Sequence, residues 1–269
     1  MKYEPIKASL GKVFNNIPVL RIIFYKMLDL LLLRAWHIKK ELRKIKKQTG
    51  PNASVLDAGA GFGQYTYYMS TFSKGWSITG VDIIDAQIED CNRFFAKINK
   101  SQQVKFEKAD LTAFLRPESF DLITSVDVME HIEDDRAVFS NFYKSLKKGG
   151  CVLISTPSDK GGSDAHDNDD HSFIAEHVRN GYNIDEIAEK LTTAGFSKVE
   201  CLYQYGTPGK ISWTLSMKFP IIMLNKTKLL FILLPFYYIV TFPFCFILNY
   251  FDLQMKHAEG TGLIVKAWK

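Results

Sequence analysis

After Asn52, short β-rich runs alternate with helical stretches along most of the chain. Five such runs come in order at Ser54–Asp57, Ser77–Asp82, Val104–Lys108, Phe120–Ser125 and Gly150–Ser155. A sixth, Lys198–Tyr205, follows a helical stretch at Asn183–Ala194, and a β-rich run from Gly260 to Lys269 closes the chain. Strands separated by helices are typical of a parallel sheet whose faces are covered by those helices. The pattern therefore predicts an α/β fold with a doubly wound, seven-stranded sheet.

The length and composition fit one catalytic domain with added segments. A chain of 269 residues, 46% of them hydrophobic, can bury a full core. We assign residues 1–49 to a basic helical extension and residues 50–269 to the domain that contains the sheet. Residues 213–251, between the last two β-rich runs, form an apolar insertion within that domain.

The extension combines positive charge with an apolar helical pattern. Residues 1–50 contain 12 Lys and Arg against 3 Asp and Glu, although the whole chain is only +5. Apolar residues recur at helical spacing between Leu20 and Ile45, with basic residues on the opposite face. Around Leu30, Leu32 and Leu33 the predicted helix is apolar on every side, so we expect it to have a second apolar neighbour.

The run VLDAGAGFG follows the first strand and places Gly59, Gly61 and Gly63 at alternate positions. Glycine is needed where the backbone takes a positive φ or comes close to a ligand. The turn leads into a helix whose first N–H groups would face that ligand. Dinucleotide-binding turns follow GxGxxG instead, and the sixth position here is Gln64. The spacing therefore disfavours NAD.

Two acidic residues follow the next two strands. Asp82 ends the second strand and can accept hydrogen bonds from both ribose hydroxyls of an adenosine. Asp110 follows the third strand, where it can accept the adenine amino group while Leu111 lies against the ring. Sheets of this type bind ligands at the carboxyl ends of their strands. The glycine turn and the two carboxylates together predict a site for an adenosine-bearing cofactor.

These motifs, in this order and spacing, resemble those of the class I S-adenosylmethionine-dependent methyltransferases over about residues 53–205 and again over 260–269. VLDAGAGFG, GVDI and KADL are similar to the first three motifs of that family, and FDLITSVDVMEHI and LKKGGCVLISTP to its fourth and fifth strands. The resemblance implies a Rossmann-like sheet with an antiparallel last strand, and S-adenosylmethionine as the cofactor. The pocket that it implies is lined by Asp57, Gly59, Gly61, Gly63, Asp82, Ile83, Asp110, Leu111 and Ser125.

Methyl transfer from a sulfonium requires an acceptor atom held in line with the methyl group, and it requires no covalent protein nucleophile. An alcohol or phenol acceptor usually needs a base, so the histidines and carboxylates beyond the fourth strand are candidates. They are Asp127, Glu130, His131, His166, His171, Glu176 and His177. Of these we take His131, His171 and His177 as the candidate catalytic residues. The resemblance to relatives of the same superfamily also places Tyr182 toward the substrate.

The side chains of Asp127, Glu130 and His131 have the i, i+3, i+4 spacing of one helix face. A helix beginning near Val128 would bring together three possible ligands for a divalent ion. The group resembles the ExxEH motif of the ubiquinone- and menaquinone-pathway methyltransferases, with Asp127 in place of the first glutamate. A Glu-His pair also occurs at this point in relatives without a metal. Both interpretations stay open, and we assign no residue to a metal.

The insertion contains Leu229–Leu248, a stretch of 20 residues without a charge that Pro235 and Pro243 interrupt. In the fold that the resemblance implies, the flanking strands form an antiparallel pair, so the segment leaves and re-enters on one side of any membrane. A single spanning helix cannot do so. Either a hairpin dips into one leaflet or a helical lid covers the acceptor pocket. Both arrangements favour an apolar acceptor.

We therefore expect O-methylation of a hydrophobic or lipid-linked small molecule, with peripheral membrane contact through residues 20–47 and 213–251. The alternatives are a soluble small-molecule or nucleic-acid methyltransferase, and a membrane scaffold that has the fold without catalysis. In the soluble case, the two apolar segments would cover each other. The basic helix lacks interleaved aromatic residues, so we do not expect nucleic acid as a partner.

Two further features predict the cytoplasm, at the cytosolic face of a membrane. The N-terminal run MKYEPIKASL lacks both the apolar core and the small-residue cleavage site of an export signal. The cysteines lie far apart and without ligand spacing, which suits reduced thiols in a reducing compartment. They are Cys91, Cys151, Cys201 and Cys245.

Overall fold

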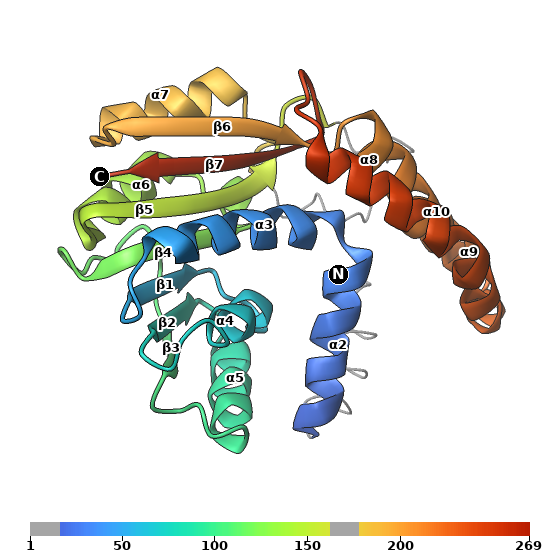
Figure 1. Cartoon of the computed structure of the whole chain (residues 1–269), viewed down its shortest axis with the longest axis horizontal. Coiled ribbons are helices and arrows are strands. Elements are labelled where there is room, and N and C mark those ends of the chain that lie inside the picture. The colour runs from blue at the N-terminus through green and yellow to red at the C-terminus, as the bar shows by residue number, and fades with distance from the viewer. Residues whose placement is uncertain (1–16, 162–177) are drawn as a thin grey trace.

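A seven-stranded sheet runs through the computed structural model, which describes residues 17–161 and 178–269 (Figure 1). Its strand order is β3-β2-β1-β4-β5-β7-β6. Strands β1 to β5 are parallel, whereas β7 runs antiparallel to both β5 and β6. The predicted α/β fold with an antiparallel last strand is therefore confirmed. The strands are β1 Ser54–Ala58, β2 Ser77–Asp82, β3 Val104–Lys108, β4 Phe120–Val126, β5 Leu146–Pro157, β6 Lys198–Gln204 and β7 Gly262–Trp268.

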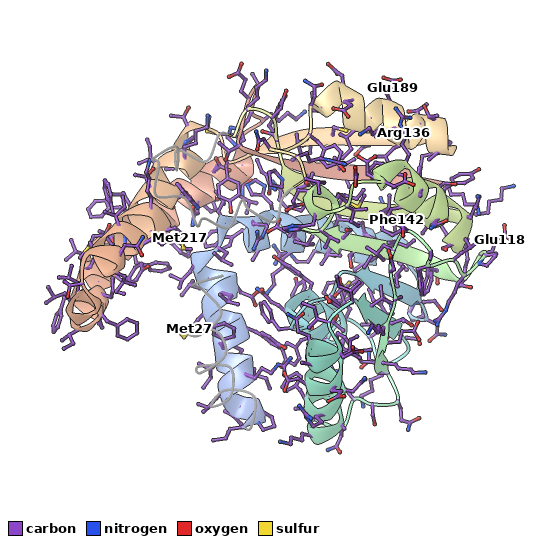
Figure 2. The ribbon with its side chains drawn as sticks, turned by 180° about the vertical axis from the view of Figure 1, so that it is seen from behind. Met27, Glu118, Arg136, Phe142, Glu189 and Met217 are labelled. Atoms are coloured by element: carbon purple, nitrogen blue, oxygen red, sulfur yellow. The ribbon has the colours of Figure 1, made fainter. Side chains whose placement is uncertain are left out.

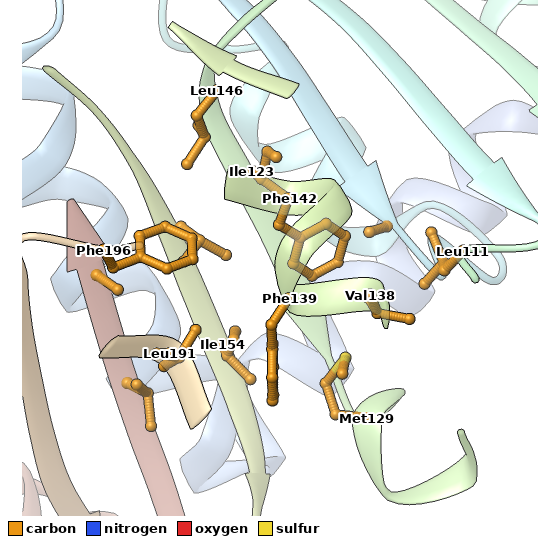
Figure 3. Packing of buried hydrophobic residues seen from close by; sticks show 14 of the residues in the cluster. Leu111, Ile123, Met129, Val138, Phe139, Phe142, Leu146, Ile154, Leu191 and Phe196 are labelled. Atoms are coloured by element: carbon orange, nitrogen blue, oxygen red, sulfur yellow. The ribbon is translucent and has the colours of Figure 1, made fainter. Parts of the chain in front are cut away.

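Helices bury both faces of the sheet. Successive residues of a strand point to opposite faces, so Leu56 packs in one apolar cluster and Val55 in the other. The first cluster lies under α6 and α7, and Figure 3 shows Phe139 and Phe142 of α6 in it. The second lies under α3, α4 and α5. These helices are α3 Leu33–Gln48, α4 Gln64–Met69, α5 Asp85–Lys97, α6 Asp135–Ser145 and α7 Ile184–Ala194.

Local side chains and one glycine set the ends of the helices on the first face. The Asp134 carboxylate accepts a hydrogen bond from the Ala137 N–H at 3.1 Å and caps α6. Asn183 caps α7 in the same way through the Asp185 N–H at 2.9 Å. Gly195, with a φ of 113°, ends α7 in the left-handed region, where glycine is favoured.

The predicted single helix from Leu20 to Ile45 is wrong, because the chain breaks at Leu32. Helix α2 Pro18–Leu31 ends there, and α3 begins at Leu33, with Leu32 extended at φ −93° and ψ 110°. Each half is buried against a different surface. Helix α3 packs across the sheet through Ile38 and Leu42, whereas α2 packs beside α4 and α5 through Tyr25. One straight helix could not follow both surfaces, and Figure 1 shows the steep angle between the two.

A helical hairpin connects β6 to β7 and projects from the sheet (Figure 1). It consists of α8 Thr207–Trp213, the π-helix η2 Thr214–Lys218, α9 Phe219–Lys226, the 3-10 turn η3 Lys228–Ile232 and α10 Leu234–Gln254. The chain reverses at η3, and α10 packs back against η2 and α8. The pairing of both Gln204 and Pro157 with Gly262 places the hairpin at the carboxyl ends of the parallel strands.

Candidate active site

Three glycines with positive φ form the turn between β1 and α4. The φ values are 75° at Gly59, 52° at Gly61 and 80° at Gly63, in a region that other residues rarely adopt. The Gly59 N–H donates a hydrogen bond to the Val81 carbonyl at 2.9 Å and ties the turn to β2. A Cβ at Gly59 would lie 2.3 Å from Cγ2 of Val128, so the close approach also requires glycine. The turn has the tight shape that its spacing predicts.

Asp82, at the end of β2, is hydrogen-bonded to the same turn. Its Oδ2 accepts from the Gly61 N–H at 2.9 Å, and its Oδ1 accepts from the Ile84 N–H at 3.0 Å. A carboxylate offers about four acceptor positions, so two are available for the hydroxyls of a ribose. The neighbouring Ile83 is 65% exposed, an apolar surface on which a ring can pack.

Asp57 and Ser125 are buried at the ends of β1 and β4. Asp57 accepts hydrogen bonds from the hydroxyls of Thr66 and Thr124, the latter at 3.0 Å. Burial raises the pKa of Asp57, and the two hydroxyls oppose that rise. Asp57 therefore fixes α4 against the sheet. The Ser125 Oγ is also buried, but it makes no hydrogen bond within residues 17–161 and 178–269, which leaves a polar atom for a ligand at this edge.

Asp110 and Leu111, which follow β3, differ in exposure. Asp110 is exposed, and its Oδ1 accepts hydrogen bonds from the N–H and the hydroxyl of Thr112. These hydrogen bonds hold the pKa of Asp110 below its ordinary value. Leu111 is buried in the cluster under α6. Their contacts with adenine therefore stay a prediction.

The geometry fits an adenosine-bearing cofactor. The glycine turn allows close approach at Gly59, and at Gly61 an added Cβ would meet only Gln87 Oε1, at 3.8 Å. Asp82 supplies the carboxylate for a ribose, and the Ser125 hydroxyl lacks a protein partner within the described ranges. The donors and acceptors present are those that an adenosine requires. None of these contacts requires a covalent bond or a metal.

The predicted helix beginning near Val128 is wrong. Asp127 has a φ of 52°, which turns the chain away from helical geometry, and only the 3-10 turn η1 Met129–His131 follows. Asp127 then pairs with Arg34, whereas Glu130 points to the Thr156 hydroxyl at 3.0 Å. Burial is the main cause of the raised pKa of Glu130. Among the described residues, no three His, Cys, Asp or Glu side chains form a group that could hold a metal ion.

The candidate catalytic residues fall in two places. His131 is exposed on η1, next to the buried Glu130 and close to the carboxyl end of β4. The others lie outside the described residues, together with two further candidates of the same segment: His166, His171, Glu176 and His177. The catalytic roles of His131, His171 and His177 therefore stay predictions.

Tyr182 is buried, with only 1% of its surface exposed. Its hydroxyl donates to Asp135 Oδ2 at 2.7 Å, and the Arg179 guanidinium lies 4.8 Å from its ring centroid. Its ring belongs to the cluster under α6 and α7. The expectation that Tyr182 faces the substrate is therefore wrong, because the pairing with Asp135 directs its hydroxyl into the core.

An Arg34 cluster, which sequence reasoning missed, lies at the carboxyl end of β4. Arg34, at the start of α3, pairs with Asp127, and its backbone N–H donates to the hydroxyl of Tyr205 at 2.9 Å. Burial raises the pKa of both Tyr65 and Tyr205, and the charge of Arg34 opposes the rise in each. Asp127 and Tyr205 both have positive φ, a strain that is often found at functional sites. The one signal in the sequence was a charged residue within the apolar run from Leu30 to Trp36.

Arg21, one of the basic residues of the extension, is buried. Its guanidinium donates to Asp90 Oδ2 at 2.6 Å and to the carbonyl of Phe62, in the glycine turn, at 2.7 Å. Tyr25 donates to the same carbonyl and shares the hydrogen-bond network with Arg21. Helix α2 is therefore fixed directly onto the glycine turn. The described part of the extension therefore adjoins the candidate active site.

Comparison with known proteins agrees with this geometry. A family model described as a methyltransferase domain matches residues 22–201. The chain is 33% identical over 153 residues to a phosphoethanolamine N-methyltransferase of Triticum aestivum. The matched region covers 55% of this chain and 29% of that protein. It is 28% identical over 102 residues to a ubiquinone biosynthesis O-methyltransferase of Idiomarina loihiensis, covering 38% of this chain and 41% of that protein.

A solved structure shares the fold. Phosphoethanolamine N-methyltransferase 2 of Haemonchus contortus, in complex with S-adenosyl-L-methionine, superposes with a TM-score of 0.59. The sequence identity is 23%, and the match covers 86% of this chain and 52% of the other. The chain therefore spans between about a third and a half of the length of these relatives.

The fold, the glycine turn and the carboxylate at the end of β2 define a class I S-adenosylmethionine-dependent methyltransferase. The chain belongs to the methyltransferase-domain family, whose model matches most of its length. The predicted class, fold and cofactor are confirmed. Its substrates and its location stay predictions.

Proposed function

We propose that this chain transfers a methyl group from S-adenosylmethionine to an oxygen of a hydrophobic or lipid-linked small molecule at the cytosolic face of a membrane. The cofactor supplies a methyl group that is activated on a sulfonium. The glycine turn and Asp82 would hold the cofactor, and the Arg34 cluster would lie on the acceptor side. The proposal for the membrane depends mainly on the helical hairpin.

The hairpin has its polar residues inside and its apolar residues outside, which is the observation that carries the proposal. Ser212, Ser216 and Asn249 are buried between its two halves. In contrast, Ile239 is 71% exposed and Phe244 is 63% exposed. Soluble helices pack in the reverse way, with the apolar stripe inside. Small and polar residues between helices and large apolar ones outside are typical of helices that contact lipid.

Helix α10 extends this apolar surface along its length. Among the described helices it is long and apolar enough to cross a membrane, yet only 11% of its most apolar stretch is buried. Tyrosine hydroxyls near its start are turned inward, since Tyr237 donates to the Leu215 carbonyl at 2.6 Å and Tyr238 to the Ser216 carbonyl at 2.7 Å. An exposed apolar surface of this size needs a partner. Because the hairpin starts and ends on one side, entry into a single leaflet fits it better than a span.

The base of the hairpin adjoins the acceptor side. A small hollow there is lined by Leu32 and Leu33 of the helix break, by Trp213 and Met217, and by Tyr205. Tyr205 also contacts the backbone of Arg34, which pairs with Asp127. An apolar molecule that leaves the hairpin surface would therefore meet the Arg34 cluster next. The exposed His131 of η1, which follows Asp127 in the chain, would then serve as the base for a hydroxyl acceptor.

A transfer assay with radiolabelled S-adenosylmethionine tests the chemical half of the proposal. The purified full chain should label a molecule in the apolar phase of a total membrane extract, and the Asp82→Ala variant should label it far more slowly at a limiting cofactor concentration. Hydriodic acid treatment, under conditions that release methyl iodide from O-methyl groups and leave N-methyl and C-methyl groups intact, would then establish an oxygen acceptor. Label found only in the aqueous phase would contradict an apolar acceptor.

Vesicle flotation tests the membrane half. The full chain should float with phosphatidylcholine vesicles, and the double variant Ile239→Ser/Phe244→Ser should not. Leu115→Ser/Val178→Ser is the matched control, because it removes two exposed apolar side chains that do not belong to the hairpin. Equal flotation of all three proteins, or of none, would contradict membrane contact through the hairpin.

A second candidate is N-methylation of a phosphorylated amine in water. The observation in its favour is the 33% identity to the wheat protein, which is named a phosphoethanolamine N-methyltransferase. The same transfer assay separates the two, since phosphoethanolamine added as the only acceptor would become labelled. The hairpin would then serve a purpose other than acceptor delivery.

A further inference from the structure

We propose that a hollow between α2, α3 and the end of α10 binds the phosphate-bearing headgroup of an anionic membrane lipid. This headgroup hollow has a volume of about 360 Å³. Its lining includes Lys26 and Leu30 of α2, Trp36, Lys39 and Arg43 of α3, and Leu253 of α10. None of the residues assigned above to the cofactor pocket or to the Arg34 cluster lines it.

The charge of the headgroup hollow favours an anion. Three cationic side chains line it, against one carboxylate, Asp29. The negative charge of that carboxylate is already balanced, because it forms an ion pair with Lys39. It also accepts a hydrogen bond from Gln64 Nε2 at 2.8 Å. Lys26 and Arg43 are both exposed. Burial lowers the pKa of Lys39, so a phosphate beside it would also favour its charged form.

Apolar rows on both sides of the headgroup hollow indicate a lipid and not a soluble phosphate. Val19, Ile23, Met27 and Leu30 recur at helical spacing on α2, and all four are exposed. Phe246 and Tyr250, which are also exposed, form the second apolar row, on α10. A phosphate held by the cations would have acyl chains against these rows. Figure 2 shows Met27 directed to the side on which Met217 of the hairpin lies.

Trp36 joins the two apolar rows at the headgroup hollow. Its ring centroid lies 5.0 Å from that of Phe246, and its Nε1 donates to the Leu30 carbonyl at 3.2 Å. A tryptophan with one apolar and one polar side is typical of the boundary between acyl chains and headgroups. The cations, Trp36 and the apolar rows therefore follow the order of a membrane surface, from headgroup to acyl chain.

This inference rests on the proposed membrane contact and adds its lipid preference. The test compares flotation of the full chain with phosphatidylcholine vesicles that either lack or contain phosphatidylglycerol. The wild type should bind the anionic vesicles more tightly. Lys26→Glu/Arg43→Glu should lower that affinity by about tenfold or more, because each basic residue at an anionic surface contributes on the order of 1 kcal/mol. Its affinity for neutral vesicles should not change.

The matched control is Lys105→Glu/Lys144→Glu, which reverses two exposed lysines on β3 and α6 and changes the net charge equally. An equal loss in the control, or no loss in the test variant, would overturn the headgroup hollow. Displacement by water-soluble glycerophosphate would overturn the commitment to a lipid. If the wild type binds RNA and the test variant does not, the cations serve nucleic acid, and the assignment to a lipid is overturned as well. Unchanged S-adenosylmethionine binding, measured by calorimetry, shows that the variants are folded.

Failure of this inference is distinguishable from failure of the proposed function. Equal binding of the wild type to neutral and anionic vesicles, lost only in Ile239→Ser/Phe244→Ser, would overturn the headgroup hollow and leave the hairpin contact standing. Binding that depends on Lys26 and Arg43 but not on Ile239 and Phe244 would overturn the hairpin contact alone. A wild type that floats with neither vesicle would overturn both.

Discussion

Arg34, at the start of α3, forms an ion pair with Asp127, at the end of β4. The pair joins the basic extension to the strand ends where the cofactor site lies, and Asp127 takes a φ of 52° to reach it. The extension therefore has two attachments to the site, since Arg21 also binds the Phe62 carbonyl of the glycine turn. The loss of either attachment, at Arg21 or at Arg34, should therefore be felt at the active site.

The Arg34–Asp127 pair should show coupling in a double-mutant cycle of Arg34→Ala, Asp127→Asn and the double variant. Both side chains are 31% exposed, so we expect a coupling of only about 1 kcal/mol in the free energy of urea unfolding. The Lys108–Asp85 pair, with side chains 60% and 68% exposed, is the control and should show almost none. Strictly additive changes at Arg34 and Asp127 would contradict the pairing.

Asp82→Ala should weaken the binding of S-adenosylmethionine by roughly 10- to 100-fold, because a hydrogen bond to a charged group contributes about 1.5–3 kcal/mol. Part of the loss would come from the Gly61 N–H, which loses its acceptor. Calorimetry measures the dissociation constant directly. Asp85→Ala is the matched control, because Asp85 is an exposed carboxylate that pairs only with Lys108 among the described ion pairs. Equal effects of the two variants would remove Asp82 from the cofactor site.

The sheet and the glycine turn could be predicted because their signals are local. The central strands are short, mostly apolar runs, since both faces of the sheet are covered there, and Gly59 to Gly63 form one turn within a few residues. The antiparallel direction of the last strand then followed from the resemblance. Features that depend only on residues close together in the sequence could therefore be predicted.

The break at Leu32 and the Arg34 cluster could not be predicted, because they depend on distant surfaces. A run that is apolar on all sides indicates a second neighbour but not its direction, and α2 and α3 pack on different neighbours. Arg34, Asp127 and Tyr205 come from three separate segments. The polar interior of the hairpin was hidden in the same way, since Ser212 and Asn249 are buried only once its two halves pack.

Gly59→Ala should destabilise the protein more than Gly149→Ala. Both glycines have a similar positive φ, 75° and 78°, so each substitution has the backbone cost of roughly 1–2 kcal/mol. At Gly59 the new Cβ would also meet Val128 Cγ2 at 2.3 Å, whereas at Gly149 no atom lies within 4 Å. Urea unfolding measures the difference, and Val128→Ala should recover part of it. Equal destabilisation at the two positions would show that the turn adjusts without cost.

Glu130→Gln should make the stability of the protein less dependent on pH. Burial is the main cause of the raised pKa of Glu130 in the folded chain, above its ordinary value of 4.5. Below that value the residue is protonated in both states, and its ionisation has no effect on folding. As the pH rises, the unfolded chain releases the proton first, so the folded state loses relative stability until the pH passes the folded pKa.

The wild type should therefore lose stability relative to Glu130→Gln above pH 4.5, and urea unfolding without cofactor at several pH values measures the difference. The glutamine can still accept from Thr156, so packing should be preserved. Glu133→Gln, at an exposed glutamate, is the control and should follow the wild type. A constant difference between the wild type and Glu130→Gln at all pH values would show that burial does not perturb this carboxyl group.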